Sequence, residues 1–440
     1  MSPEFIAISM FFVLVIFLFL GHPLAFVLGG VGIIYGFLGI GPQFVGIVIN
    51  RTYGVMDNFV LVAITLFILM GNFLTVSGVA DGLFKSLRFL LGPVRGGLGL
   101  AVIGVCIVFA ACTGIVGASV VTMGLLAGPL LIRYGYQKEL TMGMVAAGGS
   151  LGILIPPSIM LVIMGDQAAI SVGQLLLGAV VPGVSLGILY MIYIGVRCWI
   201  DPTLGPPLPP EEMAGISKGE VIKGALKYAL PPLGLIFAVL GSIFMGLATP
   251  TEAAGVGAFA AFILMVVYGK FTWATFRDCL YQTAKTTTMV LVIVVGASCF
   301  TAVFLGLGGG TALVDGMLGL GLGKWGTYFL MMFILIILGM FIDWIGIVMI
   351  VFPIFLPVAK ALGFDTVWFV IMMAVNLQMS FLSPPFGYAL FYLSGLGIKD
   401  VTLSHIYRGV IPFLIIQFIG LMIFTYWPDL TLWLPRLMLK

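Results

Sequence analysis

Two pairs of adjacent prolines, Pro156-Pro157 and Pro384-Pro385, interrupt long apolar segments of the sequence. A proline lacks the backbone N–H and clashes with the carbonyl one turn earlier, so two in succession break a helix and free several carbonyls. Freed carbonyls and helix C-terminal ends at membrane depth suit a sodium ion, whereas helix N-termini suit a carboxylate. The sodium-binding candidates around the proline pairs are Gly148, Gly149, Ser150, Asn376, Gln378 and Ser380, and the candidate substrate contacts are Ser158 and Ser383.

A proline pair can also be a packing kink, because membrane helices tolerate proline where neighbouring groups satisfy the freed backbone. The duplication favours a site over a kink. Residues 148–158 and 376–386 carry their proline pairs at the same position, at an offset of 228 residues. Duplicated broken helices are typical of secondary transporters and indicate where substrate and ion bind.

Two further segments, residues 97–131 and 326–360, each consist of two apolar pieces joined at a polar or glycine-rich point. We interpret both as re-entrant hairpins, because each piece is somewhat short for a full span. Non-helical backbone at membrane depth survives only where protein or a water-filled cavity surrounds it. Two ordinary, tightly packed spans are the alternative. The sodium-binding candidates at the two tips are Thr113, Gly114, Ser119, Asp343 and Gly346. We expect the tips to approach the broken helices and form two paired sites, with Thr113 and Ser119 close to residues 148–150, and Asp343 and Gly346 close to residues 376–380.

Asp343 is a lone carboxylate inside an apolar run. Such residues are costly at membrane depth and usually functional. Asp343 is therefore expected to take part in ion binding or gating. It can also cap the second helix of its hairpin, and capping does not exclude the ionic role.

The composition indicates the class of protein to which these elements belong. Apolar residues make up 62% of the 440-residue chain and charged residues 8%, against about 25% charged in a soluble domain. We therefore predict an all-α, polytopic membrane protein without a separate soluble domain, and we expect its first apolar run to be a retained span and not a signal peptide. The predicted spans are residues 5–20, 23–40, 59–77, 140–168, 172–196, 228–247, 252–268, 287–304, 367–397 and 410–427.

The basic residues orient these spans. With the N-terminus outside, 14 of the 19 Lys and Arg residues fall on one side, which is then cytoplasmic. Arg95 and Arg133 flank the first hairpin on that side, so it enters from the cytoplasm and the second hairpin enters from the opposite face. The basic residues that fall outside are Arg51, Lys324, Lys360, Arg436 and Lys440.

The same layout predicts an inverted-topology repeat, because an odd number of spans separates the starts of the two units. The predicted units are residues 1–200 and 223–440. Residues 201–222 form a polar, proline-rich cytoplasmic linker between them.

Other functional classes lack support in the sequence. The glycine-rich residues 306–310 follow a membrane helix and not a strand, and no catalytic or zinc motif occurs, so neither ATP binding nor an enzyme is indicated. A net charge of +3 without a basic cluster gives no reason to expect nucleic acid. Five scattered cysteines without a CxxC pair are expected to be buried thiols. A passive channel is disfavoured, because inverted broken helices suit alternating access.

Residues 113–119, 134–136, 147–158, 248–254 and 376–388 together resemble the large membrane subunit of the tripartite ATP-independent periplasmic (TRAP) transporters, and the similarity extends over nearly the whole chain. In many relatives the first hairpin tip reads Ser-Gly-Ser-Ser. Here residues 113–116 read Thr-Gly-Ile-Val, so two hydroxyls are missing. Residues 341–344 resemble a branch associated with keto acids, hydroxy acids and related monocarboxylates.

The resemblance implies an elevator-type sodium symporter in a bacterial inner membrane, or an archaeal membrane. It would import an organic acid anion, such as a C4-dicarboxylate, keto acid or hydroxy acid, with Na+ as coupling ion and no cofactor. It further implies a small four-helix membrane subunit and a periplasmic solute-binding protein as partners. A stand-alone, ion-coupled carboxylate carrier without a binding protein is the alternative within transport.

Overall fold

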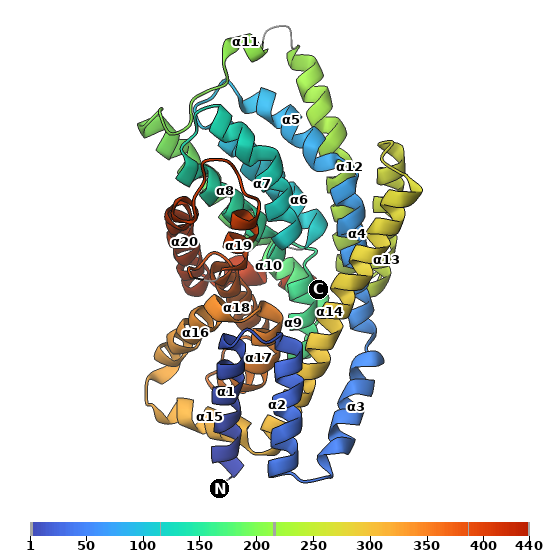
Figure 1. Ribbon diagram of the computed structural model, residues 1–440, viewed down its shortest axis with the longest axis vertical. Coiled ribbons are helices and arrows are strands. Elements are labelled where there is room, and N and C mark those ends of the chain that lie inside the picture. The colour runs from blue at the N-terminus through green and yellow to red at the C-terminus, as the bar shows by residue number, and fades with distance from the viewer. Residues whose placement is uncertain (1–2, 115, 214–216, 386, 439–440) are drawn as a thin grey trace.

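The computed structural model describes residues 3–114, 116–213, 217–385 and 387–438, and all regular elements in these ranges are helical (Figure 1). The helices of the first half are α1 (Pro3–Phe19), α2 (Leu24–Gly39), α3 (Phe44–Met56), α4 (Phe59–Val76), α5 (Val79–Leu91), α6 (Gly97–Thr113), α7 (Val116–Arg133), α8 (Lys138–Ser150), η1 (Leu151–Ile153), α9 (Ile159–Ala168) and α10 (Val172–Ile200). The remaining helices are α11 (Pro210–Met213), α12 (Lys218–Phe244), α13 (Pro250–Val267), α14 (Trp273–Gly306), α15 (Gly309–Gly319), α16 (Gly323–Phe341), α17 (Trp344–Ala361), α18 (Thr366–Ser380), α19 (Tyr388–Gly395), α20 (Leu403–Tyr426) and α21 (Asp429–Met438). The all-α prediction is confirmed.

Nine of the described helices are long and apolar enough to cross a membrane, and several shorter ones are equally apolar. Large apolar side chains such as Phe26, Phe237 and Phe259 remain exposed on these helices. Extensive exposed apolar surface of this kind is stable where lipid covers it. The chain is therefore a multi-pass membrane protein.

Four helices, α3, α5, α15 and α21, lie outside the predicted spans, hairpins and linker. Helix α5 is amphipathic: Leu83 and Phe84 are buried, whereas Asp81 and Lys85 are exposed. A helix with one polar face lacks the continuous apolar run by which a span is identified, so hydropathy alone does not reveal it. The predicted linker is also shorter in the structure, because α12 begins at Lys218; its residues 214–216 lie outside the described ranges.

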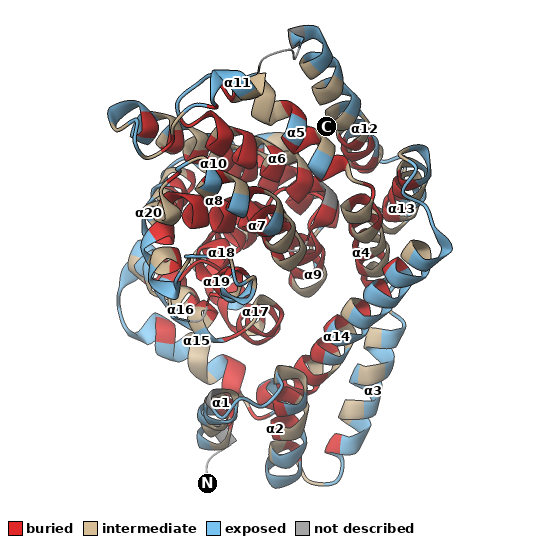
Figure 2. Ribbon diagram, turned by 45° about the horizontal axis from the view of Figure 1, so that its top comes forward, coloured by how far each residue is buried: buried red, intermediate tan, exposed pale blue. Residues whose placement is uncertain are grey.

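The helices form two groups, which Figures 1 and 2 show from two directions. In the first group α6–α10 pack together with α16–α20. In the second group α2 packs along α14, α4 packs along α13, and α3 lies against α14. Burial is densest in the first group, where α8 and α18 are buried along almost their whole length. The first limb of each broken helix therefore lies inside protein, and so does the first break, as backbone without helical hydrogen bonds requires. The second limb of the second broken helix, α19, is partly exposed.

The helix bounds recur along the chain at an offset close to 228 residues. This shift carries α7 to residues 344–361, the bounds of α17, and carries α8 to residues 366–378, within α18. We call α6–α7 and α16–α17 the first and second hairpins, and α8–α9 and α18–α19 the first and second broken helices. The order of hairpin, broken helix and long helix thus occurs twice.

The ends of each hairpin lie together. On the first hairpin, the Gly96 amide donates to the Gly205 carbonyl at 2.8 Å, and the Gln137 amide donates to the Leu204 carbonyl at 3.0 Å. On the second hairpin, Lys324 Nζ donates to the Gly363 carbonyl at 3.0 Å. Each pair of helices therefore returns to the side from which it starts. This holds for a re-entrant hairpin and for two ordinary spans alike, and the lengths of α7, α16 and α17 would permit a full crossing. Figure 1 shows the first hairpin in the upper half of the view and the second in the lower half.

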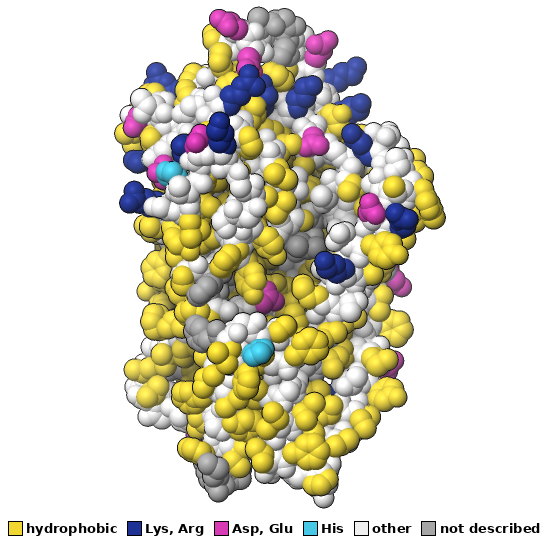
Figure 3. Space-filling view, in the orientation of Figure 1, with side chains coloured by type: hydrophobic (Ala, Val, Ile, Leu, Met, Phe, Trp, Pro, Cys, Tyr) yellow, Lys and Arg dark blue, Asp and Glu magenta, His cyan; other side chains and the backbone are white. Residues whose placement is uncertain are grey.

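The charged side chains gather at one end of the molecule. Figure 3 shows most of the visible Lys and Arg side chains at the upper end, where α5, α11 and the start of α12 lie in Figure 1. The lower part of this face is mostly apolar.

Candidate functional site

The tip of the first hairpin is a compact, buried turn with two bonded hydroxyls. Gly114 ends α6 with φ +60, a left-handed conformation that favours glycine. Thr113 Oγ1 lies 2.9 Å from Ser119 Oγ and also donates to the Phe109 carbonyl at 3.2 Å. Both hydroxyl side chains are buried. The neighbouring Ile115 lies outside the described residues. The described part of the tip offers the two hydroxyls and backbone carbonyls.

The first broken helix lies directly against this tip. A Cβ built on Gly114 would be 3.2 Å from the Pro157 carbonyl oxygen, and one on Gly152 would be 3.6 Å from Ser119 Oγ. A Cβ on Gly149 would meet the backbone of Val120 in α7 at 2.9 Å. Only glycine at this position lets α8 approach the hairpin so closely. The predicted proximity of the first tip to the first broken helix is therefore present in the structure.

Between the two limbs of this broken helix, residues 154–158 are not helical. Ser158 caps α9 by accepting from the Leu161 amide at 3.4 Å, and its hydroxyl donates to the Ile153 carbonyl. Gly148 faces Cys106 of α6, whose Sγ would lie 2.7 Å from an added Cβ. Pro156-Pro157 and Pro384-Pro385 both occupy breaks between helices, as predicted.

The second broken helix contacts the second hairpin through different residues from those expected. Asn376 Nδ2 donates to the Met332 carbonyl at 2.8 Å, and an added Cβ on Gly339 would collide with the Ser380 side chain. Gly346 instead faces Leu24 of α2 and Ile342. The expectation that Gly346 approaches residues 376–380 is therefore wrong; Gly339, seven positions earlier on the other limb of the hairpin, makes that approach.

Asp343 sits between the limbs of the second hairpin. Its Oδ2 accepts from the Ile345 amide at 3.3 Å, so it caps α17. It also lies within electrostatic reach of Tyr388 and Tyr392 in α19. The capping alternative is thus realised. Ser383, in the break itself, donates to the Met379 carbonyl at 2.9 Å; Phe386 lies outside the described residues.

The two broken helices meet at Ser150 and Gln378. Gln378 Nε2 donates to Ser150 Oγ at 3.4 Å, and Ser150 Oγ donates to the Ala147 carbonyl at 2.8 Å. Gln378 Oε1 and Asn376 Oδ1 are buried and have no hydrogen-bond partner among the described residues. Buried polar oxygens are nearly always satisfied by protein, water or an ion. The sequence identified all three residues but assigned them to two separate sites, because it contains no information on how the halves pack.

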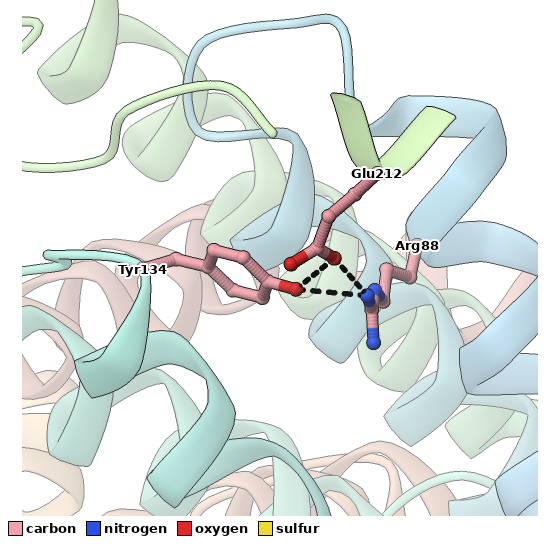
Figure 4. A network of polar contacts seen from close by, with 3 residues as sticks. All are labelled: Arg88, Tyr134 and Glu212. Atoms are coloured by element: carbon pink, nitrogen blue, oxygen red, sulfur yellow. Dashed lines mark hydrogen bonds and ion pairs between the residues drawn. The ribbon is translucent and has the colours of Figure 1, made fainter. Parts of the chain in front are cut away.

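A polar network at the base of the first hairpin was missed at the sequence level (Figure 4). Glu212 of α11 accepts from Arg88 Nη2 of α5 at 2.6 Å and from the Tyr134 hydroxyl after α7. The Tyr134 hydrogen bond, and after it the Arg88 charge, lowers the pKa of Glu212. Desolvation and the bond to Glu212 raise the pKa of Tyr134. These residues are far apart in sequence, so only the fold reveals that the linker is attached to the hairpin.

A sequence model of the family described as the tripartite ATP-independent periplasmic transporter, DctM component, matches residues 11–430. The chain is 34% identical over 387 residues to the C4-dicarboxylate TRAP transporter large permease protein DctM of Pseudomonas aeruginosa, with 88% of each chain covered. It is 32% identical over 391 residues to the sialic acid TRAP transporter large permease protein SiaM of Vibrio cholerae, with 89% of each covered.

Among solved structures, the YdaH transporter of Alcanivorax borkumensis has a similar fold, with a TM-score of 0.65 at 16% identity, covering 98% of this chain and 100% of that one. This likeness shows the fold alone. The match over 420 residues and the relatives above 30% identity show the family. The chain belongs to the DctM family, the large permease components of the TRAP transporters.

Proposed function

We propose that this chain is the large membrane subunit of a sodium-coupled, binding-protein-dependent secondary transporter that imports an organic acid anion. The observation that carries the proposal is the junction of the two broken helices. Ser150 and Gln378 meet there, and the buried oxygens of Gln378 and Asn376 have no partner among the described residues. A desolvated sodium ion requires such oxygens, and broken helices at membrane depth provide them in secondary transporters.

The proposed ion sites extend from this junction to the two hairpin tips. The first comprises the tip hydroxyls of Thr113 and Ser119 with the carbonyls freed around residues 150–157. The second comprises Asp343 with Asn376 and Ser380. Oxygen ligands alone suit sodium, which needs no nitrogen or sulfur donor. Ser158 and Ser383, one in each break, are the proposed contacts for the substrate.

The proposed mechanism is an elevator motion of one helix group against the other. The hairpins, the broken helices, α10 and α20 would move together, while the group containing α2, α4, α13 and α14 stays fixed. The twofold occurrence of the same helix order, with the hairpins in opposite halves of Figure 1, supports an inverted repeat. The basic end of the molecule in Figure 3 would face the cytoplasm of a cell with this chain in its inner membrane.

The proposed cargo and partners rest on the family. The compared relatives carry the names of a C4-dicarboxylate and of sialic acid in their descriptions, and both are carboxylates. The description of the family as one component of a tripartite transporter supports two further subunits. We propose a small four-helix membrane subunit and a periplasmic binding protein for these roles.

Reconstitution into proteoliposomes tests this function. The chain, its small subunit and a loaded binding protein should take up a labelled organic acid when sodium is higher outside, without ATP. Uptake driven by a proton gradient in the absence of sodium would refute sodium coupling. Equal uptake of free substrate without the binding protein would favour the stand-alone carrier instead.

A further inference from the structure

A polar hollow of about 430 Å³ lies between the two helix groups, away from the junction of the broken helices. Helices α3 and α14 of one group line it on one side, and α9 and α17 of the other group line it opposite. Its polar lining residues are Arg51, Gln167, Ser298, Thr301 and Lys360. The volume lies within the usual range for a pocket that encloses a small molecule.

The charge of this hollow is unbalanced. Arg51 and Lys360 both line it, and its lining, as far as the structure describes the chain, contains no acidic residue. The ion pairs found among the described residues join other side chains, so neither cation has a carboxylate at salt-bridge distance in that part of the chain. The nearest acid in sequence to the lining, Asp166, already accepts hydrogen bonds from Asn58 and Gln167. Two cations in a concave site of this kind attract an anion.

The neutral lining suits a carboxylate with additional oxygens. Thr301 Oγ1 donates to the Met349 carbonyl at 3.0 Å, which joins the two helix groups across the hollow. Ser298 supplies a second hydroxyl, and Met349 and Phe352 supply apolar wall. The O–H of Thr301 is already donated to Met349, so Ser298 is the hydroxyl that can donate to a bound carboxylate. The two cations, this donor and the apolar surface together fit a small organic acid.

The position of the hollow connects it with the proposed substrate contact. Gln167 lies at one end of α9 and Ser158 caps the other end. A ten-residue helix is about 15 Å long, so a molecule in the hollow lies roughly one short helix away from the first break. Arg51 and Lys360 also belong to the side of the chain that the basic-residue bias assigns to the outside.

We propose that this hollow is an outer receiving site for the organic acid anion, in which Arg51 and Lys360 hold its carboxylate before it reaches the broken helices. The assignment of the anion rests on the function proposed above, whereas the attraction of anions by the hollow does not. Because the two cations belong to different helix groups, relative motion of the groups would separate them and weaken the hold on the anion.

The electrostatic potential in the hollow can be tested without a transport assay. A thiol is placed in the hollow, and its reaction rates with charged reagents are measured. Ser298→Cys is made in a background whose five native cysteines are replaced by alanine, in nanodiscs of zwitterionic lipid. The anionic reagent 2-sulfonatoethyl methanethiosulfonate is compared with the cationic 2-(trimethylammonium)ethyl methanethiosulfonate. The rate with the anionic reagent is divided by the rate with the cationic reagent. For Ser298→Cys this ratio should be about tenfold or more higher than the same ratio for a free thiol in solution. Arg51→Gln with Lys360→Gln should abolish this excess, whereas Arg436→Gln, an outer cation paired with Asp429, should preserve it.

Two further measurements identify the occupant. First, the organic acid that the complex transports should slow the labelling of Ser298→Cys. Second, Arg51→Gln with Lys360→Gln should raise the KM of the transporter for this organic acid about tenfold or more, with a smaller change in kcat. An unchanged reagent ratio after removal of both cations overturns the anion site. A charge-dependent ratio without protection by the organic acid, or with protection only by anionic lipid, overturns its role as a substrate site. If wild-type uptake proves independent of sodium while the ratio and the protection hold, the function proposed above fails and the receiving site stands.

Discussion

The side-chain amide of Gln378 lies 3.4 Å from the hydroxyl of Ser150, and the two residues are 228 positions apart. This separation is the offset at which the helix bounds recur, so equivalent positions of the two broken helices touch each other. A contact between equivalent residues is expected where a twofold axis passes between two repeats. The Ser150–Gln378 contact therefore locates the centre of the proposed transport body.

Removal of the oxygen of Gln378 should weaken sodium activation. Gln378→Leu keeps the side-chain size but deletes the unpartnered Oε1, and a lost contact of about 1.4 kcal/mol corresponds to a tenfold weaker activation constant. Sodium-dependent uptake measures this constant. Gln417→Leu is the matched control, because Gln417 in α20 is also a fully buried glutamine, and it lies beside Tyr190. Equal effects of the two substitutions would contradict a special role for Gln378.

Replacement of the first proline pair should impair transport more than folding. Pro156→Ala with Pro157→Ala lets the helix continue and removes carbonyls from the proposed ion site. The loss of 1–2 kcal/mol of ion binding would weaken sodium activation about five- to thirtyfold. Uptake against sodium concentration and the yield of monodisperse protein separate the two effects.

The control for this substitution is Pro231→Ala with Pro232→Ala, since that pair lies within the continuous helix α12. We expect the control to leave sodium activation unchanged. Normal transport with unchanged sodium affinity in the Pro156 and Pro157 double variant would mean that these prolines are packing kinks.

The charge of Asp343 and its capping role can be separated with asparagine, which caps as well as aspartate. We expect Asp343→Asn to leave the amount of folded protein unchanged and to weaken sodium activation at least about tenfold, since a contact with a charged group contributes roughly 1.5–3 kcal/mol. Asp365→Asn is the control, because Asp365 caps α18 by accepting from the Trp368 amide at 2.9 Å. If both variants transport with wild-type sodium dependence, Asp343 only caps its helix.

The attachment of the linker to the first hairpin should depend on pH. The folded-state pKa of Glu212 lies below its ordinary value of 4.5. A carboxyl with a lowered folded pKa contributes stability above its unfolded pKa, and this contribution is lost as pH falls through the folded value. Hydrogen exchange of residues 201–213, corrected for intrinsic rates, should therefore accelerate on acidification below about pH 4.5. Glu212→Gln should show fast exchange already at pH 7, and high salt should reduce the difference because the ion pair is partly exposed.

A pH-independent exchange rate in the wild-type linker would contradict this account. Asp201 provides an internal comparison, since Thr203 rather than the hairpin network lowers its pKa. Asp201→Asn should leave the attachment of α11 intact.

The sequence by itself determined the class and the local breaks. A 62% apolar composition leaves membrane helices as the stable arrangement, because unpaired backbone groups are too costly in lipid. The repeated proline pairs predicted where the broken helices lie, and the short apolar pieces predicted the hairpins. The candidate residues Thr113, Ser150 and Gln378 were chosen from these positions. The amphipathic helix α5 was not predicted, because it has no continuous apolar run and is stabilised by packing its apolar face against the protein.

The tertiary structure gives the physical reason why two proline pairs interrupt a helix and a third does not. Pro231-Pro232 lies in the continuous α12, many of whose side chains are exposed, whereas Pro156-Pro157 is buried and Pro384-Pro385 follows the buried α18. Lipid cannot hydrogen-bond freed carbonyls, but surrounding protein can enclose them. Three further features depend on how distant segments pack, which local sequence does not encode. They are the meeting of the hairpin ends, the Ser150–Gln378 contact and the presence of Arg51 and Lys360 in one hollow.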